Sequence, residues 1–418
     1  MRPALPVGKG FSPLDEELGL LPGALSPWLH EALVHLGTWM PFAQAARELA
    51  FFTRVVVSEA TATRATEAAG AAWVALQAAE VERLEGEQPE PPPGPPVQPV
   101  SADGALVPLV GGAWAEVKTV VIGTVETTIA ANGERTVSTH ERSYFSRLAD
   151  AETFTRLALV ELHRRGTETA GTVVAPMDGA DWEQTFLDVH RPDAIRILDF
   201  SHALEHLATA AQATFGPGTA ETSAWLEEQA HTLKHGDPDA VLGALRALPT
   251  ERAKDPVEAE RVRDATLHYL EKRREQIQYA AFQALGYPIG SGSVESANKL
   301  VVEARLKGSG MHWARPNVDA LLALRTIACS DRWEAAWPQI ETTLREQARS
   351  RRQARRRAKP LAPTPPPTPP RPPIPPATTR TRPLAPAAAP TIVNGRPTAE
   401  HPWKKYPVLP GRHSPAKS

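Results

Sequence analysis

The sequence has one cysteine, Cys329, among 418 residues. A single thiol excludes an internal disulfide framework and a cysteine-based zinc site, and it is typical of a reducing cytoplasm. The sequence also lacks an apolar run long enough to cross a bilayer, and its N-terminus has no signal-peptide pattern. We therefore expect a soluble cytoplasmic protein with no membrane partner.

The charge of the chain is nearly balanced overall but unevenly distributed. Residues 346–418 contain 15 Lys and Arg against two Asp and Glu, although the formal net charge of the whole chain is −2. A basic tail on an acidic body predicts electrostatic attraction of a polyanion by the tail. The alternative, a solvated end that binds nothing specific, is equally compatible with this composition.

Proline marks two breaks in the chain. Residues 86–100 are proline-rich and predict a semi-rigid linker after a helical N-terminal region, 1–85. The second break follows residue 350, where an arginine-rich run leads into a Pro-, Thr- and Ala-rich tail. Residues 351–418 are expected to be disordered, because they cannot bury enough apolar surface to offset the entropy lost on ordering.

Before the linker, the apolar spacing predicts three helices. They cover residues 26–40, residues 41–53, and a third stretch capped by Ser58 that runs to about residue 82. Helix, short turn and capped helix form the outline of a helix-turn-helix, with Arg64 on the expected recognition helix. Any α-hairpin gives the same outline, so DNA binding and simple packing both remain open here.

After the linker, the pattern changes to β-strands. Gly111-Gly112 is expected in the loop between the first two strands and Asn132-Gly133 in the hairpin turn before the third. The expected elements are strands at 102–110, 116–128 and 134–145, a helix at 150–165, strands at 172–177 and 194–199, and a helix beginning near His202.

Three antiparallel strands, a crossover helix and a βαβ unit follow the order of a ribonuclease-H-like mixed α/β sheet. A right-handed crossover would place the fourth strand beside the first, so Asp103 and Asp178 would be neighbours. We assign the first part of this core to 101–215, a helical insertion to 216–286, and the last part to 287–350.

Three carboxylates lie where such a sheet would bring them together. Asp103 lies in the first strand beside Gly104, Asp178 follows the fourth, and Glu295 lies in the first turn of a helix capped by Ser293. Each has an ordinary alternative: a turn, a helix N-cap and a favourable interaction with the helix dipole. Together they could hold two Mg²⁺ ions, with Mn²⁺ as a substitute, for phosphodiester chemistry.

Other polar residues are expected to support this site. Asp199, His202 and His206 have metal-ligand spacing, but a hydrogen-bonded supporting role is the favoured interpretation. Trp182 is expected to pack in the core or, less favoured, to stack on a base. Lys299 can form an i,i+4 ion pair with Glu295 or contact a phosphate.

Five ordered blocks of this sequence resemble those of bacterial insertion-sequence transposases of the ISKra type, whose catalytic residues are Asp, Asp and Glu (DDE). The resemblance covers nearly the whole chain. The blocks are Asp103 to Lys118, Met177 to Trp182, Leu198 to His206, Tyr287 to Lys299 with Arg305 through Trp313, and Asn394 to Trp403.

This resemblance implies a ribonuclease-H-like core interrupted by a helical insertion. It also implies that Asp103, Asp178 and Glu295 form the metal-binding catalytic triad, with Asp199 and His202 as an auxiliary pair. The implied activity is cutting and rejoining DNA at insertion-sequence ends by a homo-oligomer, in the bacterial cytoplasm and on the nucleoid. The basic residues expected to contact DNA are Arg64, Lys299, Arg305, Lys307, Arg351 and Arg352.

The sequence departs from the family at its start. Such proteins typically carry a Cys-rich, zinc-ribbon-like segment before the stretch Gly10 to Glu16, and here no cysteine precedes it. This predicts a shortened copy. Two other functions follow as alternatives: a catalytically inactive DNA-binding remnant that uses 26–82 and 349–359, and a metal-dependent nuclease that cleaves without joining strands.

Overall fold

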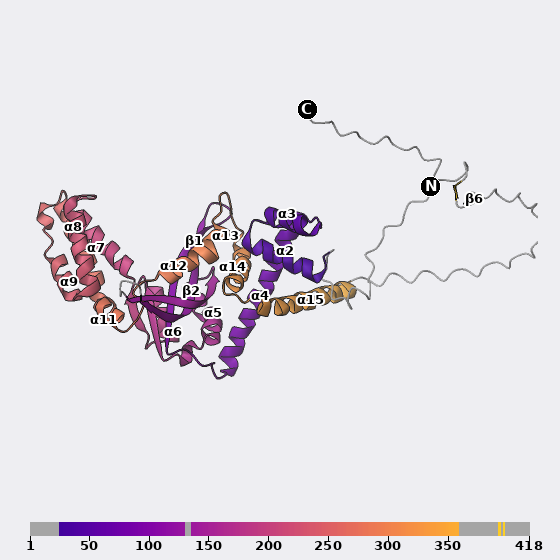
Figure 1. Cartoon of the computed structure of the whole chain (residues 1–418), viewed down its shortest axis with the longest axis horizontal. Helices are drawn as coiled ribbons and strands as arrows, with labels where there is room; N and C mark the ends of the chain where they lie inside the picture. Colours follow the sequence, from indigo (N-terminus) through magenta and orange to yellow (C-terminus); the bar gives the residue numbers. More distant parts are fainter. Residues whose placement is uncertain (1–24, 130–134, 359–391, 394–395, 398–418) are drawn as a thin grey trace, which may run out of the picture. The chain divides into compact units, whose positions relative to one another are not determined.

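The computed structural model describes residues 25–129, 135–358, 392–393 and 396–397 (Figure 1). The chain divides into two compact units, residues 1–358 and 359–418. In the second unit, strands β6 (Ile392–Val393) and β7 (Arg396–Pro397) pair antiparallel. The first unit has a mixed α/β fold that is mostly helical.

One five-stranded mixed sheet organises this unit, in the order β3-β2-β1-β4-β5. β1, β2 and β3 are antiparallel neighbours, whereas β4 runs parallel to both β1 and β5. The expectation that the fourth strand lies beside the first is confirmed. The strands are β1 (Val97–Pro108), β2 (Trp114–Ile129), β3 (Arg135–Arg147), β4 (Thr172–Met177) and β5 (Ile195–Leu198).

Local sequence explains most strand limits. Gly111 and Gly112 both take positive φ in the β1–β2 loop, a conformation that glycine adopts without the steric cost of a side chain. The expected Asn132-Gly133 turn lies outside the described residues. β1 begins at Val97, five residues before the expected start, because Val97 to Pro99 pair with β4.

Alternation along the strands gives the sheet two buried faces. One face, with Val100 and Ala102 from β1, packs under α5 (Ala151–Arg164) and α6 (Asp181–His190). On the other face, Ala105 and Val107 pack against residues 294–322. These come from α12 (Gly292–Ala297), a π-helix (Asn298–Glu303), α13 (Ala304–Leu306) and α14 (Arg315–Cys329). Asp103 lies two residues before Ala105, so its side chain points to the same face of the sheet, the face that α12 covers.

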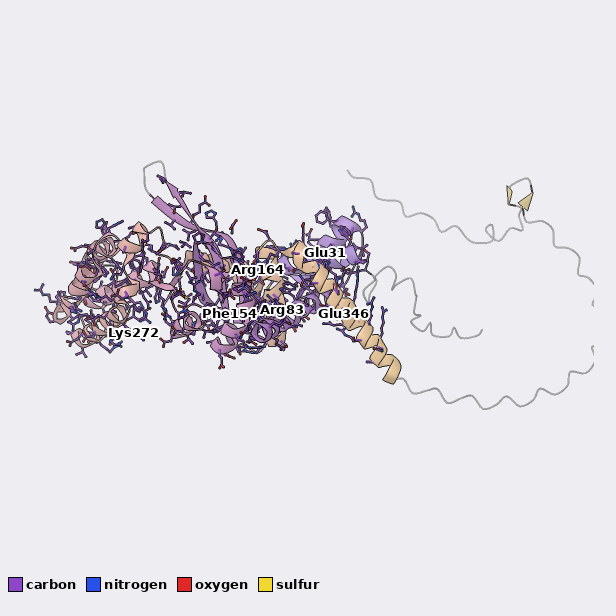
Figure 2. All side chains as sticks on the ribbon, turned by 90° about the horizontal axis from the view of Figure 1, so that it is seen from below. Glu31, Arg83, Phe154, Arg164, Lys272 and Glu346 are labelled. Carbon is purple, nitrogen blue, oxygen red and sulfur yellow. The ribbon has the colours of Figure 1, made fainter. Side chains whose placement is uncertain are left out.

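A helical insertion follows β5 and packs around its own core, formed by residues such as Leu207, Leu233, Leu245 and Leu270. In Figures 1 and 2 these helices lie at one end of the unit, with Lys272 among them. The insertion contains α7 (Phe200–Phe215), α8 (Ala220–His235), α9 (Pro238–Arg246), α10 (Pro256–Lys272) and α11 (Tyr279–Ala284).

The three expected N-terminal helices are present as α2 (Pro27–Trp39), α3 (Phe42–Thr53) and α4 (Glu59–Glu87). The Ser58 hydroxyl caps α4 by accepting a hydrogen bond from Thr61 N at 3.2 Å, as predicted. These helices are not separated from the rest of the unit. α4 packs against α14 and α15 (Trp333–Ala358), and the buried Arg147 of β3 donates a hydrogen bond to Gln77 of α4.

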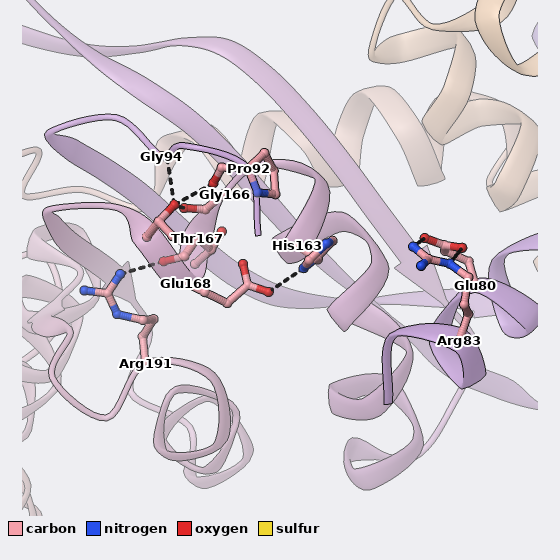
Figure 3. Close-up of polar contacts among 10 residues, drawn as sticks. Glu80, Arg83, Pro92, Gly94, His163, Gly166, Thr167, Glu168 and Arg191 are labelled. Atoms are coloured by element: carbon pink, nitrogen blue, oxygen red, sulfur yellow. Dashed lines mark hydrogen bonds and ion pairs between the residues drawn. The ribbon is translucent and has the colours of Figure 1, made fainter. Parts of the chain in front are cut away.

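The proline-rich segment is docked on the sheet domain and does not act as a free linker (Figure 3). Gly94 N donates a hydrogen bond to the Thr169 hydroxyl at 2.8 Å, and this hydroxyl donates to Pro92 O at 2.6 Å. A Cβ atom on Gly94 would lie 2.2 Å from Gly166 O, so only glycine fits this contact. The expected boundary at 86–100 is therefore an internal connection of one compact unit.

Two further findings concern the ends of the described chain. Helix α15 continues to Ala358, so the helix extends eight residues beyond the break expected after residue 350. The tail that follows lies almost entirely outside the described residues. Within the part that the structure describes, no helix combines the length and apolar character needed to cross a membrane.

Candidate functional site

Asp103 lies in the middle of β1, opposite Thr119 of β2, on the sheet face that α12 covers. Its Oδ1 accepts a hydrogen bond from Gly104 N at 2.6 Å, and its Oδ2 accepts one from Asn298 Nδ2 at 2.8 Å. Burial raises the pKa of this carboxyl above its usual range, and the nearby charges of Glu295 and Glu116 act in the same direction. The strand position predicted for Asp103 is confirmed.

Asp178 directly follows β4, and the β1–β4 register, continued along both strands, puts it opposite Asp103. The next residue, Gly179, has φ +80°, and a Cβ atom there would lie 2.7 Å from Arg273 Nε. The Tyr269 hydroxyl donates to Asp178 O at 2.8 Å, and Arg273 Nη2 donates to Gly179 O at 2.7 Å. Side chains of the insertion therefore hold the loop that carries Asp178.

The pKa of Asp178 is raised to about 6. Burial is the largest cause, followed by the negative charge of Asp103; Asp199 and Glu295 raise the pKa further, whereas His202 lowers it. Like charges close together disfavour ionisation of each carboxyl. The raised pKa of Asp178 thus reflects its burial first and the negative charge of neighbouring carboxylates second.

Glu295 lies on α12, which begins at Gly292 with Ser291 in the N-cap position and not with Ser293 as expected. The Ser291 hydroxyl donates a hydrogen bond to Glu295 Oε1 at 3.4 Å. The side chain is exposed, and its charge acts on both Asp103 and Asp178. Asp103 and Asp178 are thus opposite each other on neighbouring strands, and the charge of Glu295 raises the pKa of both.

The donor atoms of this cluster fit a hard divalent cation. All three side chains offer carboxylate oxygens, which Mg²⁺ prefers, and the buried Oδ1 of Asn298 beside Asp103 has no hydrogen-bond partner. Across residues 25–129 and 135–358, no group of three or more His, Cys, Asp or Glu side chains is already arranged as a ligand set for a metal ion.

Asp199 and His202 lie beside the cluster in the supporting positions that the sequence favours. Asp199 is buried at the end of β5, where Oδ1 accepts from His202 N at 2.7 Å and Oδ2 accepts from Ser291 N at 2.6 Å. It thereby caps α7 and holds the loop that leads to Glu295. His206 stacks on Tyr269 with ring centroids 4.0 Å apart, so the two histidines border the Asp178 loop.

Glu183 belongs to this site although sequence reasoning missed it. Its side chain is 2% exposed, and Oε2 accepts hydrogen bonds from Gly179 N at 2.9 Å and Ala180 N at 3.1 Å. Burial and the charge of Asp178 raise its pKa to about 8. The available signal was the third position of helix α6, where a glutamate often reaches back to the helix start.

Two expected auxiliary residues take structural or exposed positions. Trp182 packs on the core in a T-shaped arrangement with Phe154, and Lys118 Nζ lies 5.3 Å from the centroid of the Trp182 ring. This is the core-packing alternative. Lys299 is exposed and forms no ion pair with any described residue, so of its two alternatives the pairing with Glu295 is not formed.

Two of the residues expected to contact DNA, Arg305 and Lys307, make contacts within the protein. Arg305 is 1% exposed, donates to Gly37 O at 3.1 Å and lies over the Phe42 ring. A DNA contact is incompatible with this burial, so that expectation is wrong, and Arg305 instead connects α13 with α2. Lys307 is exposed but paired with Glu303 at 2.6 Å.

The other basic residues lie near the N-terminal helices. Arg64 and Arg351 are exposed and line a shared cavity of about 580 Å³ with Val55 and Leu344. Arg352 is half-buried near the end of α15. These positions leave Arg64 and Arg351 accessible to a polyanion.

Comparison of the chain with models of known protein families and with curated protein sequences finds no match.

Proposed function

We propose that this chain is a DDE-type transposase of the kind its sequence blocks resemble, which cuts and rejoins DNA at insertion-sequence ends. The observation that carries the proposal is that adjacent strands place Asp103 and Asp178 opposite each other, with the charge of Glu295 acting on both. These residues are far apart in the sequence, and the sequence pattern predicts the same three as a metal-binding set.

The topology supports a ribonuclease-H-like core. The strand order is β3-β2-β1-β4-β5. Each of the first three strands is antiparallel to its neighbour, and β4 and β5 run parallel to β1. This is the arrangement expected for that fold. The helical insertion between β5 and α12 matches the interrupted core that the resemblance implies.

Two Mg²⁺ ions held by Asp103, Asp178 and Glu295 would supply an activated nucleophile and stabilise the leaving oxygen of the cleaved phosphodiester. The chain itself would contribute orientation. Tyr269 and Glu183 hold the Asp178 loop through its backbone, and Asp199 fixes the loop before α12. The raised pKa of Asp178 would fall when a cation neutralises the cluster.

The test compares Asp178→Asn with Asp181→Asn, an exposed carboxylate three residues away on α6. Each variant is incubated with Mg²⁺ and DNA that carries the sequences flanking the coding region, and nicking and strand transfer are measured. We expect Asp178→Asn to lose activity by orders of magnitude and Asp181→Asn to retain it. Equal activity of Asp178→Asn and wild type would refute the proposal.

A DNA-binding remnant without catalysis is the second candidate. The exposed Arg64 and Arg351 at one cavity favour it, because they can bind phosphates without the carboxylates. Binding to the flanking DNA without Mg²⁺-dependent cleavage in the wild type would support this candidate. Cleavage without strand transfer would instead indicate a nuclease.

A further inference from the structure

A cavity of about 1030 Å³ lies between the β2–β3 hairpin and the helical insertion. In Figure 2 this hairpin projects from the sheet on the side of the insertion. Thr139 and Arg142 line the cavity from β3, Lys234 from the end of α8, and Gln283 from α11. None of the carboxylates of the candidate site lines it.

The charge of this cavity is of one sign. Arg142, Lys234 and His235 line it, and none of the described lining residues is Asp or Glu. Arg142 is exposed and Lys234 half-buried, and neither forms an ion pair with any described residue. His140 is the exception, because its Nδ1 lies 3.3 Å from Glu126 Oε2. Two cations thus remain available for a ligand in a chain whose body is acidic.

The cavity is continuous with the loop that precedes Glu295. Gly290, Gly292 and Ser293 line its floor, and Ser291 between them is hydrogen-bonded to Asp199. The two glycines present only backbone, which allows another backbone to approach closely. A ligand that occupies the cavity would therefore reach the edge of the carboxylate cluster.

Tyr287 adds an aromatic surface to the same wall. It is half-buried, lines the cavity next to Pro288 and also packs against the core of the insertion. Cationic side chains beside an aromatic ring are the combination that holds single-stranded nucleic acid, because phosphates pair with the cations and bases stack on the ring.

We propose that this cavity binds the sugar–phosphate backbone of a single DNA strand next to the cleavage position, with Arg142 and Lys234 on its phosphates and Tyr287 under a base. The inference rests on the proposed function, because it takes the carboxylate cluster to act on DNA. The inference places the DNA strand between the hairpin and the insertion, away from Arg64 and Arg351. The cations also offset the repulsion between DNA phosphates and the three carboxylates.

The test uses the full chain and a labelled DNA duplex with a single-stranded extension, in the absence of Mg²⁺, so that binding is measured without catalysis. Arg142→Ala/Lys234→Ala is compared with Lys254→Ala/Lys272→Ala. The control removes the same charge from two exposed lysines of the insertion that form no ion pair with described residues and do not line the cavity. The dissociation constant is measured over a range of salt concentrations.

We expect the cavity variant to bind roughly tenfold or more weakly, with a salt slope smaller by about 1.4 for two lost contacts to a single strand. The control variant should match the wild type. Tyr287→Leu should weaken binding several-fold and Tyr287→Phe should not, because only the ring is needed. In a cleavage assay, the cavity variant should raise KM for DNA and leave kcat unchanged.

Equal affinity and salt slope in the cavity and control variants would overturn the inference. If wild-type cleavage depends on Asp178 at the same time, the proposed function still stands. The inference would also be overturned if the cavity variant lost affinity for RNA of the same sequence but kept its affinity for DNA. If the wild type never cleaves DNA but the cavity variant alone loses binding, the proposed function fails and the binding site stands.

Discussion

Replacing Glu183 with glutamine tests the electrostatics of the site through the pH dependence of the free energy of unfolding, without an activity assay. The folded chain raises the pKa of this carboxyl from 4.5 to about 8. Between these two values, the folded chain keeps a proton that the unfolded chain has lost. The contribution of Glu183 to stability is therefore most favourable below about pH 4.5 and declines as the pH rises toward 8. Glutamine removes this titration and keeps an oxygen for Gly179 N and Ala180 N.

The size of the effect follows from the shift. At about 1.4 kcal/mol per pKa unit, the shift corresponds to at most about 5 kcal/mol between the two ends of the range. Local relaxation around a buried charge lowers this value, so we expect about 2 kcal/mol or more. Relative to wild type, Glu183→Gln should become progressively more stable as the pH rises from about 5 to about 9.

The assay is denaturant unfolding of the wild type and the variant at several pH values, followed by circular dichroism. Asp181→Asn serves as the control, because it removes an exposed carboxyl from the first turn of the same helix. Parallel stability curves for wild type and Glu183→Gln across the whole pH range would show that Glu183 is ionised in the folded chain. The explanation of the site by burial and like charge would then be wrong.

Two further predictions concern contacts between segments that are far apart in the sequence. Gly70→Ala should lower thermal stability by about 2 kcal/mol, because its Cβ atom would lie 2.1 Å from Ala320 O. Gly86→Ala in the same helix meets nothing within 4 Å and should be neutral or stabilising, and equal stability losses would contradict this reasoning. Tyr269→Phe removes the hydrogen bond to Asp178 O; it should cost about 1 kcal/mol of stability and lower kcat for cleavage with KM unchanged. An unchanged kcat would exclude a positioning role for Tyr269.

Most of the sheet was predictable because local pattern and connection rules agree. β4 was predicted with its observed limits, and the crossover rule placed it beside β1. The start of β1 was missed because Pro96 and Pro99 discourage a strand assignment. In the folded chain, Gly94 fits against Gly166, and this tertiary contact aligns the proline-rich segment with β4.

The candidate site was predictable only where backbone geometry decides it. The proximity of Asp103 and Asp178 follows from two adjacent strands. Glu183 was missed because a helix-start glutamate is ordinarily exposed, and only the fold shows its burial. Arg305 was assigned to DNA for the same reason, since its burial depends on Phe42 and Gly37, which lie more than two hundred positions earlier.

The carboxylates do not hold themselves together, because their charges repel. Hydrogen bonds from uncharged donors in distant segments keep them in place: Tyr269 to the Asp178 backbone, and Asn298 to Asp103. Asp199 adds a charged anchor by accepting from Ser291 N before α12. If the cluster binds a cation as proposed, this frame would hold the backbone in place while the carboxylate side chains move into ligand positions that they do not yet occupy. The helical insertion would therefore contribute to the site in two ways, by positioning Asp178 through Tyr269 and by forming one wall of the DNA-strand cavity.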